Sequence, residues 1–543
     1  MPRPASYAMP IILACLAGSP GLAQAPLLQD GADALRQDRL GWALGEPAPS
    51  PFHVPSLEVG LGGAGSEGLY TPLVGGEGFG HGMQGWGVGM QGKYFNDGWS
   101  FEAAATAFHD GDITRGAIQR AVIAYQSKGG WRMALEQAPF QWGFGVNGGY
   151  LMGDSSRPFP RLSLHTPEAD LHLWRVPLGR WRADLFYGRL EWNRPIPSWI
   201  GNSLTQEAAK ADHGDIRRPD LSGLMVRGRF GPHVELNLGV VSMWGGVDPE
   251  GKRRREGYSL EDYMLGFVGA ENIGRTEASG SPFHFDQSSF KQISMGHALA
   301  EARVRMPAMA QYFGAKGASV YLSRGSKNVN WQWKDFLHHP GAAIHRDLSK
   351  DWELIKRGNI RGGDYMNSIW GRGIREAAPT LEHANDMIGM QLVWENWDLA
   401  LDYADTVNIP ADGNGYRVYS HGIYLAGYSR YGDPMGLAFG GDVITRTVDA
   451  GFPLFREGKG RLKVVNGIRA FRDNLALWTE AHPGSVPELN RFWFLQADAQ
   501  WRTSTGRVGG TISTERDRNP QYVNGATPRW GWAFTVFQSF RVF

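Results

Sequence analysis

The sequence predicts an all-β membrane protein, an antiparallel β-barrel of about 18 strands with short helical elements near its N-terminus and long loops. Three observations support this fold class. Several stretches, the C-terminal one above all, alternate apolar with small or polar residues at a period of two. Long and short connections alternate between those stretches. The 74 glycines and 21 tryptophans among 543 residues suit close-packed strands, tight turns and an aromatic belt at a membrane surface.

Composition excludes two other classes of protein. Only 42% of the residues are hydrophobic, and no run reaches the roughly 18 apolar residues that a membrane-spanning helix needs. A helical membrane protein is therefore excluded. The formal net charge is +1, so no basic field indicates a nucleic-acid partner.

Residues 1–25 are typical of a secretory signal peptide. Arg3 supplies the positive start, Met9–Ala17 the short apolar core and Ala23–Ala25 the small-residue cleavage site. Pro26 disfavours cleavage after Ala25, so cleavage after Ala23 is the alternative. The only cysteine, Cys15, lies in this segment, so the mature chain is expected to have no disulfide and no thiol chemistry. A lipid anchor on Cys15 is the competing interpretation.

Residues 26–55 are predicted to be a periplasmic helix and a linker, and residues 56–543 the transmembrane barrel with long extracellular loops. The helical piece runs from Asp30 to Leu44, and the prolines of residues 47–55 make the linker extended. Beyond the linker the pattern is one of strands and turns to the end of the chain.

The C-terminal stretch, Trp530–Phe543, predicts a strand with different solvents on its two faces. The apolar face carries Trp530, Trp532, Phe534, Val536, Phe540 and Val542, and the other face Gly531, Ala533, Thr535, Ser539 and Arg541. Phe543 falls on the polar face, which requires a bulge or bend at the end. The alternative, an edge strand of a soluble sheet, would invite aggregation because it is so aromatic. The stretch therefore resembles the closing strand of an outer-membrane barrel.

Four internal stretches show the same alternation. Their apolar faces are Trp181, Ala183, Leu185 and Tyr187; Val234, Leu236, Leu238, Val240 and Trp244; Trp397, Leu399, Leu401 and Tyr403; and Trp493, Leu495, Ala497 and Trp501. The opposite faces carry charged or amide residues such as Arg182, Asp184, Glu235, Asn237, Asp398, Asp402, Gln496 and Asp498. These polar faces are expected to line a lumen.

Connection lengths alternate when strands are counted back from the C-terminus. The long ones are 517–529, 472–490, 407–437, 324–385, 247–293 and 192–220. The short ones are Thr503–Gly506, 455–460, Glu395–Asn396, a moderate one at 307–316, Phe230–Pro232, Pro177–Arg180, Ser127–Gly130 and Tyr94–Gly98. Short turns in bacterial barrels are periplasmic and long loops extracellular. The even strand count then places the N-terminal helix and the C-terminus together on the periplasmic side.

A barrel of this size has room for an aqueous lumen unless something fills it. The long loops 247–293 and 324–385 are therefore expected to act as plugs, lids or binding surfaces, and they favour an occluded lumen. Ser259–Val268 is a helical piece inside the first of them, because Ser259 with Glu261 and Asp262 makes a helix start.

Five groups of motifs follow one another in order from Gln141 to the C-terminal third. They are Gln141–Gly145; Ser156–Pro160 with Leu162 and Leu164; Leu178–Trp181 with Arg189–Glu191 and Arg194–Pro197; Glu235–Gly239 with Trp244–Gly246 and Leu265–Asn272; and Tyr403–Thr406 with Gly432–Gly436 and Gly441–Asp442. In this order they resemble the Wzi family of outer-membrane capsule-assembly proteins. Gln141–Gly145 is similar to that family's Trp-Gly-Pro-Gly turn, with Phe144 replacing the proline.

The resemblance implies a barrel of about 18 strands that holds exported capsular or exopolysaccharide at the cell surface as a lectin. Such proteins are neither the export pore nor enzymes. The N-terminal helical region departs from the family, because it is short and a proline-rich linker follows it. The helical plug of the family is therefore expected to be reduced or built from other segments.

Ten residues are candidates for polysaccharide contact. The basic run Arg253, Arg254 and Arg255 suits the carboxylates of an acidic polymer through bidentate pairs; a solvated loop on anionic lipopolysaccharide is the alternative. Aromatic faces can cover sugar rings, although loop packing explains each of them equally well. The aromatic candidates and one neighbouring carboxylate are Trp331, Trp333, Tyr365, Trp370, Tyr428, Tyr431 and Asp433.

No catalytic motif stands out, so no enzyme activity, metal or cofactor is expected. The Gly-x-Ser-x-Gly, P-loop and His-Glu-x-x-His patterns are all missing from the sequence. His338, His339 and His345 lie with Asp347 in one long loop, but their spacing fits no usual metal site and solvated histidines explain them. Asp398 and Asp402 could suggest glycoside hydrolysis; lining the lumen and pairing with arginines is the alternative.

Two other functions stay open beside polysaccharide anchoring: a diffusion porin or substrate-specific channel, and a barrel enzyme that acts on lipid or glycan. The expected partners are the capsular or exopolysaccharide, outer-membrane lipid and lipopolysaccharide, and the barrel-assembly machinery during insertion. The expected location is the cell outer membrane.

Overall fold

A computed structural model describes most of the barrel wall and part of its interior. The described residues are 40–45, 56–67, 85–109, 114–153, 155, 157–174, 176–192, 217–247, 260, 263, 267, 294–327, 384–406, 429–430, 433–441, 443–469, 490–519 and 527–542. The proposed signal peptide and most of the proline-rich linker lie outside them.

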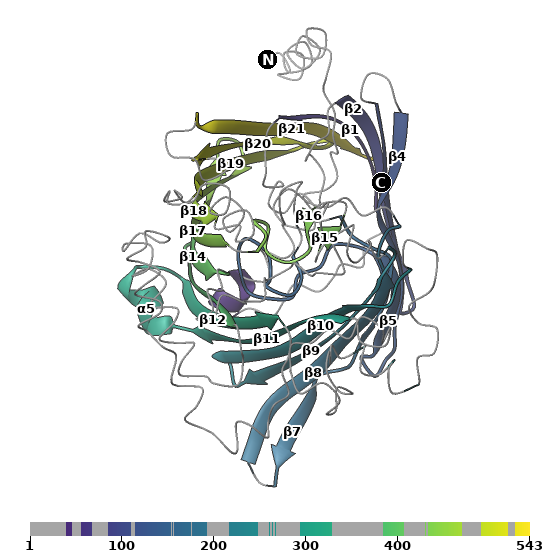
Figure 1. Cartoon of the computed structure of the whole chain (residues 1–543), viewed down its shortest axis with the longest axis vertical. Helices are drawn as coiled ribbons and strands as arrows, with labels where there is room; N and C mark the ends of the chain where they lie inside the picture. Colours follow the sequence, from purple (N-terminus) through teal and green to yellow (C-terminus); the bar gives the residue numbers. More distant parts are fainter. Residues whose placement is uncertain are drawn as a thin grey trace, which may run out of the picture.

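The described chain is almost entirely strand (Figure 1). The elements are β1 (Ser56–Glu67), β2 (Gly85–Asn96), β3 (Trp99–His109), β4 (Thr114–Gln126), β5 (Arg132–Gln137), β6 (Arg161–His165), β7 (Ala169–Leu173), β8 (Val176–Arg189), β9 (Asp220–Phe230), β10 (Val234–Trp244), β11 (Ser294–Arg305), α5 (Pro307–Tyr312), β12 (Gly317–Lys327), β13 (Ala384–Val393), β14 (Asp398–Asp405), β15 (Ser429–Arg430), β16 (Asp433–Pro434), β17 (Val443–Leu454), β18 (Gly458–Arg469), β19 (Asn490–Thr503), β20 (Gly506–Arg518) and β21 (Arg529–Arg541). None of the helices in these ranges is long and apolar enough to span a membrane.

The main sheet closes on itself because the first strand pairs with the last. Antiparallel pairing joins β1 to β21 from Glu58 opposite Arg541 to Glu67 opposite Trp532. The described sheet has 19 strands, but β6 and β7 both pair with β8. They share one place in the wall, so the ring has 18 positions, as the sequence predicts. Closure leaves no edge whose backbone groups would face lipid unpaired.

The alternation read from the sequence is confirmed along the strands. On β21, Trp530 is 61% exposed while Ala533 and Ser539 are buried, and on β14, Leu401 faces outward while Asp402 is buried inside. The apolar faces thus point to lipid and the polar faces to the lumen. Phe543, whose parity required a bend, lies outside the described residues.

Exposed aromatic residues form two belts on the outer face, one near each end of the strands. The belt near the short turns includes Tyr94, Trp99, Tyr125, Trp131 and Trp397; the opposite belt includes Trp86, Trp493, Trp530 and Trp532. Aliphatic side chains such as Ile512, Leu238 and Ile388 are exposed between the belts. Two aromatic girdles around an apolar band mark the height at which lipid surrounds the barrel.

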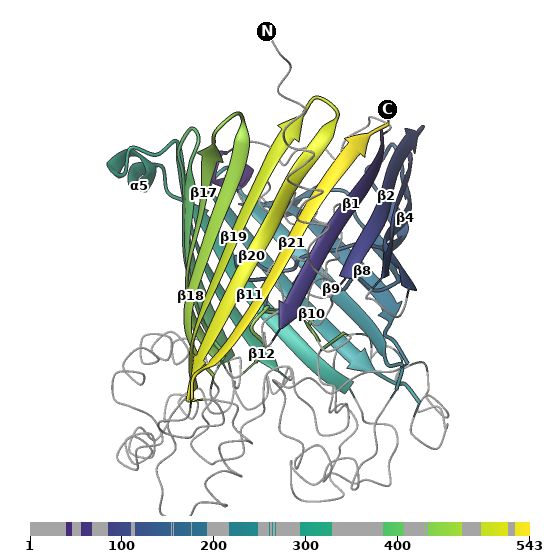
Figure 2. The same cartoon turned by 90° about the horizontal axis from the view of Figure 1, so that it is seen from above.

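The alternation of long and short connections is also confirmed. The described short turns, the C-terminal end of β21 and α5 lie at one end of the barrel, and the strand ends that the long connections join lie at the other (Figure 2). One predicted turn is wrong: Pro177–Arg180 lies inside β8, and the turn is at Trp174, between β7 and β8. Pro177 and Gly179 are typical of a turn, but here they lie in the strand β8. The strand β7 forms a hairpin with the start of β8, in which His172 lies opposite Pro177.

The described end of the predicted N-terminal helix lies inside the barrel (Figure 1), against Arg303 and Arg305 at the short-turn end of β11. Residues 40–44 are helical, and Gly45 follows with a φ of 79°, as a helix stop requires. Arg305 Nη2 donates to Leu44 O over 3.1 Å, and the guanidinium of Arg303 lies 4.6 Å from the Trp42 ring centre. This helix therefore packs against the inner face of the wall and does not extend away from the barrel.

Leu260, Tyr263 and Phe267 are helical, in agreement with the helix predicted over Ser259–Val268. This piece covers the outer face of the wall near the long-loop end. The Tyr263 ring lies 5.8 Å from Trp244, and Ser222 Oγ donates to Phe267 O over 3.0 Å. Trp244 keeps its predicted outward side of β10 but is buried there under the loop.

The membrane position predicts a depth-dependent cost of charge. Ile512 is central on β20 and 61% exposed, whereas Tyr94 is close to a short turn and 51% exposed. Ile512→Arg should cost about 2–4 kcal/mol of folding free energy and Tyr94→Arg about 0–1 kcal/mol, because only the first buries charge at mid-bilayer. Urea unfolding in lipid vesicles measures both, and equal costs would contradict the placement.

Candidate functional site

The lumen is occupied by a segment that connects neighbouring strands. Residues 138–153, here called the first inner segment, leave β5 and return to β6, although Glu136 and Arg161 of those strands pair directly. Trp142 and Met152 bridge to each other, closing the segment into a compact loop. Within the loop, the Gln141 side chain donates to the carbonyls of Gly143 and Gly145. The segment is thus an insertion that folds inward and holds its own turn.

Polar side chains on distant strands fix the first inner segment. Val146 N donates to Asp402 of β14 over 3.1 Å, and Asn147 Nδ2 donates to Thr447 of β17 over 2.6 Å. Lys463 of β18, fully buried, donates to Val146 O over 2.7 Å and to Asn147 Oδ1 over 3.0 Å. The segment therefore reaches from its own strands to the far side of the lumen.

The predicted position of Asp402 in the lumen is confirmed, and its side chain helps to hold the first inner segment. Its carboxylate accepts hydrogen bonds from Val146 N and from the Tyr321 hydroxyl. Glu301 plays the same part on β11, accepting from Phe144 N over 3.2 Å and from Asn237 Nδ2 over 2.7 Å. Charged wall residues thus bind the backbone of the first inner segment.

Residues 433–441, the second inner segment, lie against the first. Gly153 N donates to Met435 O over 2.6 Å, and Ala438 N donates to Asn147 O over 2.9 Å. Phe439 packs its ring 5.5 Å from Phe492 and 5.5 Å from Phe494 of β19. The two inner segments together contact the wall from β8 round to β19.

The hydrophobic core of the protein is inside the barrel. Inward-facing apolar residues of the wall enclose Trp142, Phe144, Leu151 and Met435; they are Phe186, Leu221, Met225, Val241, Met243, Met295, Leu299 and Met387. Trp142 and Phe186 lie 5.0 Å apart between ring centres. An aqueous pore would leave these side chains wetted, whereas here they are buried. Over this part of the lumen, packing replaces water.

Glycines allow close backbone approach within the first inner segment and between the two inner segments. A Cβ on Gly149 would lie 1.9 Å from Trp142 O, and one on Gly153 would lie 2.1 Å from Gly436 O. Gly143 and Gly148 have φ angles of 130° and 100°, which side chains disfavour. The high glycine content therefore serves the lumen as well as the strands and turns.

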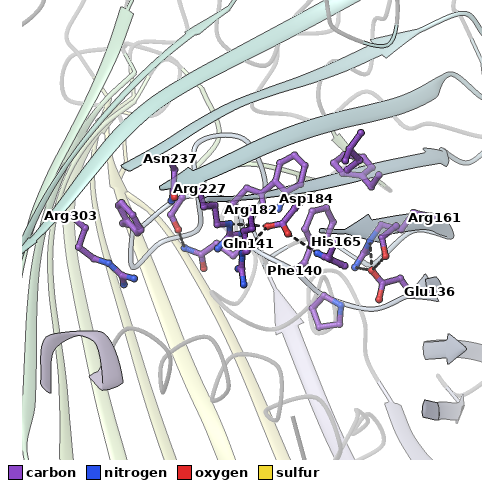
Figure 3. Close-up of a pocket in the computed structure, with 17 residues that line it drawn as sticks. Glu136, Phe140, Gln141, Arg161, His165, Arg182, Asp184, Arg227, Asn237 and Arg303 are labelled. Atoms are coloured by element: carbon purple, nitrogen blue, oxygen red, sulfur yellow. Dashed lines mark hydrogen bonds and ion pairs between the residues drawn. The ribbon is translucent and has the colours of Figure 1, made fainter. Parts of the chain in front are cut away.

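A cavity of ≈ 300 Å³ lies between the first inner segment and the wall near the short-turn end (Figure 3). Phe140 and Trp142 border it on one side. Polar residues of β5, β6 and β8–β11 border it on the other; they are Glu136, Arg161, Ser163, His165, Arg182, Asp184, Arg227, Asn237 and Arg303. Strand alternation places these side chains inward together.

Ion pairs order the charged wall of the cavity. Arg161 contacts Glu136 at 3.0 Å, and Arg303 contacts Glu235 at 2.6 Å. Asp184 is shared: His165 Nδ1 lies 2.8 Å from it, Arg227 Nε 2.9 Å and Arg182 Nε 3.8 Å. Figure 3 shows Arg182 and Arg227 directed toward the same carboxylate. Arg182 and Arg227 thus share the Asp184 carboxylate as an ion-pair partner.

Nine of the ten predicted contact residues lie outside the described residues. These are Arg253, Arg254, Arg255, Trp331, Trp333, Tyr365, Trp370, Tyr428 and Tyr431. Asp433 begins β16, where its backbone pairs with Arg430 of β15. Asp433 is also the first residue of the second inner segment. The histidines 338, 339 and 345 also lie outside, and the described residues contain no cluster of three or more metal-binding side chains.

Several residues that fill the lumen belong to the motifs of the sequence, but the motif pattern did not predict this structural role. Gln141–Gly145 lies in the first inner segment, the described residues 157–160 of the next motif lead to β6, and the described end of Gly432–Gly436 lies in the second inner segment. The loops expected to occlude the barrel, 247–293 and 324–385, lie almost wholly outside the described residues. A detectable signal was the apolar, glycine-rich run at 140–153, which is unusual for an external loop.

Comparison with known proteins shows the fold. No protein-family model and no curated protein matches the sequence. Among solved structures, Wzi, an outer membrane protein involved in group 1 capsule assembly in Escherichia coli and described as a carbohydrate-binding β-barrel, matches with a TM-score of 0.54 and 13% identity, covering 95% of this chain and 99% of that one. The likeness is one of fold. OprD and OpdQ of Pseudomonas aeruginosa match with TM-scores of 0.39 and 0.42 and 10% and 9% identity, covering 90% and 91% of this chain and 94% and 100% of theirs. The chain is an outer-membrane β-barrel.

The tight contact between the inner segments predicts a sensitive position. Gly153→Ala should destabilise the barrel by about 1–3 kcal/mol, because the new methyl group meets backbone atoms that cannot rotate away. Gly129→Ala is the matched control, since its Cβ would meet nothing closer than 3.8 Å. The midpoint of thermal unfolding, followed by the mobility of unboiled protein in SDS gels, measures both. Equal midpoints would show that the segments do not pack as described.

Proposed function

We propose that this protein binds exported capsular or exopolysaccharide and anchors it at the cell surface, as a carbohydrate-binding barrel without enzymatic activity. The observation that carries the proposal is the lumen filled by the two inner segments. A buried apolar core with fixed polar contacts is costly to displace, so it suits a binding scaffold better than a solute path.

Two further observations support the proposal. The segments that resemble the capsule-assembly family in sequence include parts of both inner segments, so the likeness involves the interior as well as the wall. The fold is similar over nearly the whole chain to that of a barrel described as carbohydrate-binding. The external contacts proposed are the polymer, outer-membrane lipid and lipopolysaccharide, with the barrel-assembly machinery engaged during insertion.

A channel is the second candidate, and one observation favours it. The lumen wall carries ladders of paired charges, such as Arg461 with Asp449 and Arg469 with Glu515 and Asp517. A polar interior also lines the water-filled channel of porins. Charge pairs of this kind also occur where the barrel is filled. Lys463, beside Asp449, donates a hydrogen bond to the first inner segment.

Deletion of the gene tests the anchoring proposal. Polysaccharide should move from the cell-bound pool to the medium while total synthesis stays unchanged, because attachment and not production is lost. Fractionation with quantification of both pools measures this, and expression of the intact gene should restore attachment. An unchanged distribution together with lost uptake of a solute would favour the channel.

Conductance separates a filled barrel from an open one. The purified protein in planar bilayers should show no steady large conductance, because the inner segments occupy the lumen. Replacement of residues 138–160 by a turn of about four residues is geometrically possible, since Glu136 and Arg161 are already paired neighbours. This variant should conduct more than the intact protein. A steady large conductance of the intact protein would refute the filled-barrel proposal.

A further inference from the structure

Guanidiniums outnumber carboxylates among the side chains that line the cavity between the first inner segment and the wall. Four guanidiniums border it or reach into it, from Arg161, Arg182, Arg227 and Arg303. Two carboxylates, of Glu136 and Asp184, line the cavity with them, and two more, of Glu235 and Glu301, adjoin it beside Arg303 and Asn237. Arg182 and Arg227 share one ion-pair partner, Asp184, which also contacts His165.

Those two arginines are accessible from the lumen. The side chain of Arg182 is 35% exposed and that of Arg227 is 22% exposed, whereas Asp184 is buried. An arginine has five N–H donors in a planar fork, and one shared carboxylate does not occupy the donors of two forks. The geometry thus leaves guanidinium donors available to a further anionic group.

Two buried polar atoms in the cavity wall also lack a partner among the described residues. Asn237 Oδ1 accepts no hydrogen bond while its Nδ2 donates to Glu301, and Arg303 Nε donates none. Both residues are at least nine-tenths buried. An unmade hydrogen bond at a buried atom has a cost in free energy. A ligand that offers a hydroxyl to Asn237 and an acceptor to Arg303 would remove that cost.

Size and shape limit the ligand further. A cavity of ≈ 300 Å³ is at the lower end of the range for small-molecule sites, so it suits one sugar ring better than a stretch of polymer. Phe140 and Trp142 border the cavity on the side of the first inner segment, and the Arg161 guanidinium lies 3.9 Å from the Phe140 ring centre.

We propose that this cavity binds a single carboxylate-bearing sugar unit, entering from the short-turn, periplasmic end of the barrel. Arg182 and Arg227 hold the carboxylate, and Asn237 accepts a hydrogen bond from a ring hydroxyl. The link between this sugar and the anchored polymer rests on the function proposed above. The site is separate from the loop residues predicted from sequence, because its lining comes from strands near the short turns.

Calorimetry on the purified full-length protein in detergent tests the site with glucuronate, glucose and inorganic phosphate as probes. Glucuronate should bind, more weakly at higher salt because the pairing is ionic, and glucose should bind at least about tenfold more weakly. Phosphate binding as tight as glucuronate binding would overturn the assignment to a sugar. Glucuronate binding no tighter than glucose binding would overturn the site altogether.

Variants on one strand locate the binding. Arg182→Gln should weaken glucuronate binding about tenfold. Arg180→Gln is the matched control, because Arg180 lies on the same strand, 58% exposed, and pairs with Glu168 outside the cavity. Unchanged mobility of both unboiled variants in SDS gels would show that they fold. Equal glucuronate affinities of folded Arg182→Gln and folded Arg180→Gln would overturn the proposal.

The same measurements separate this inference from the proposed function. Release of polymer on gene deletion, without glucuronate binding by the purified protein, would overturn the sugar site and leave the anchoring function standing. Glucuronate binding that Arg182→Gln weakens, in a protein whose deletion releases no polymer, would support the site and overturn the anchoring function.

Discussion

The pairing of β1 with β21 is the constraint on which the other features depend. Lipid offers no partner to a backbone N–H or C=O, so a sheet can cross a membrane only when its first and last strands meet. The ring of 18 positions then fixes a lumen of a size that side chains from the wall alone do not fill. The two inner segments occupy part of that space.

The inner segments fill much of the space with a core of ordinary protein packing. Trp142, Leu151 and Met435 leave water by packing against one another and against the inner face of the wall. This burial of apolar surface is the driving force that holds the segments in the lumen. Polar contacts then set the position: Lys463 and Asp402 reach the backbone around Val146 from strands far along the chain. The cavity with Arg182 and Arg227 exists because the first inner segment stops short of the wall there.

Much of the wall could be predicted from residue alternation. Trp397, Leu399 and Leu401 indicated a lipid-facing side, and Leu401 is exposed as expected. The contents of the lumen were harder to predict from the sequence. Phe492 and Phe494 interrupt the polar, inward face of β19, and only the structure explains them, because Phe439 packs against both. The turn expected at Pro177–Arg180 was wrong for a related reason: pairing with β7 overrode the local signal of a proline and a glycine.

By itself, the sequence determined the closed antiparallel barrel, its approximate strand number, which faces meet lipid and which connections are short. These follow from a period-two pattern and from turn residues, which are local properties of the chain. Only the tertiary structure decided that residues 138–153 and 433–441 fold into the lumen and meet at Gly153 and Met435. It also decided that Arg182, Arg227 and Asn237 border one cavity. Contacts between residues hundreds of positions apart depend on strand register and ring closure, and no local pattern encodes those distances.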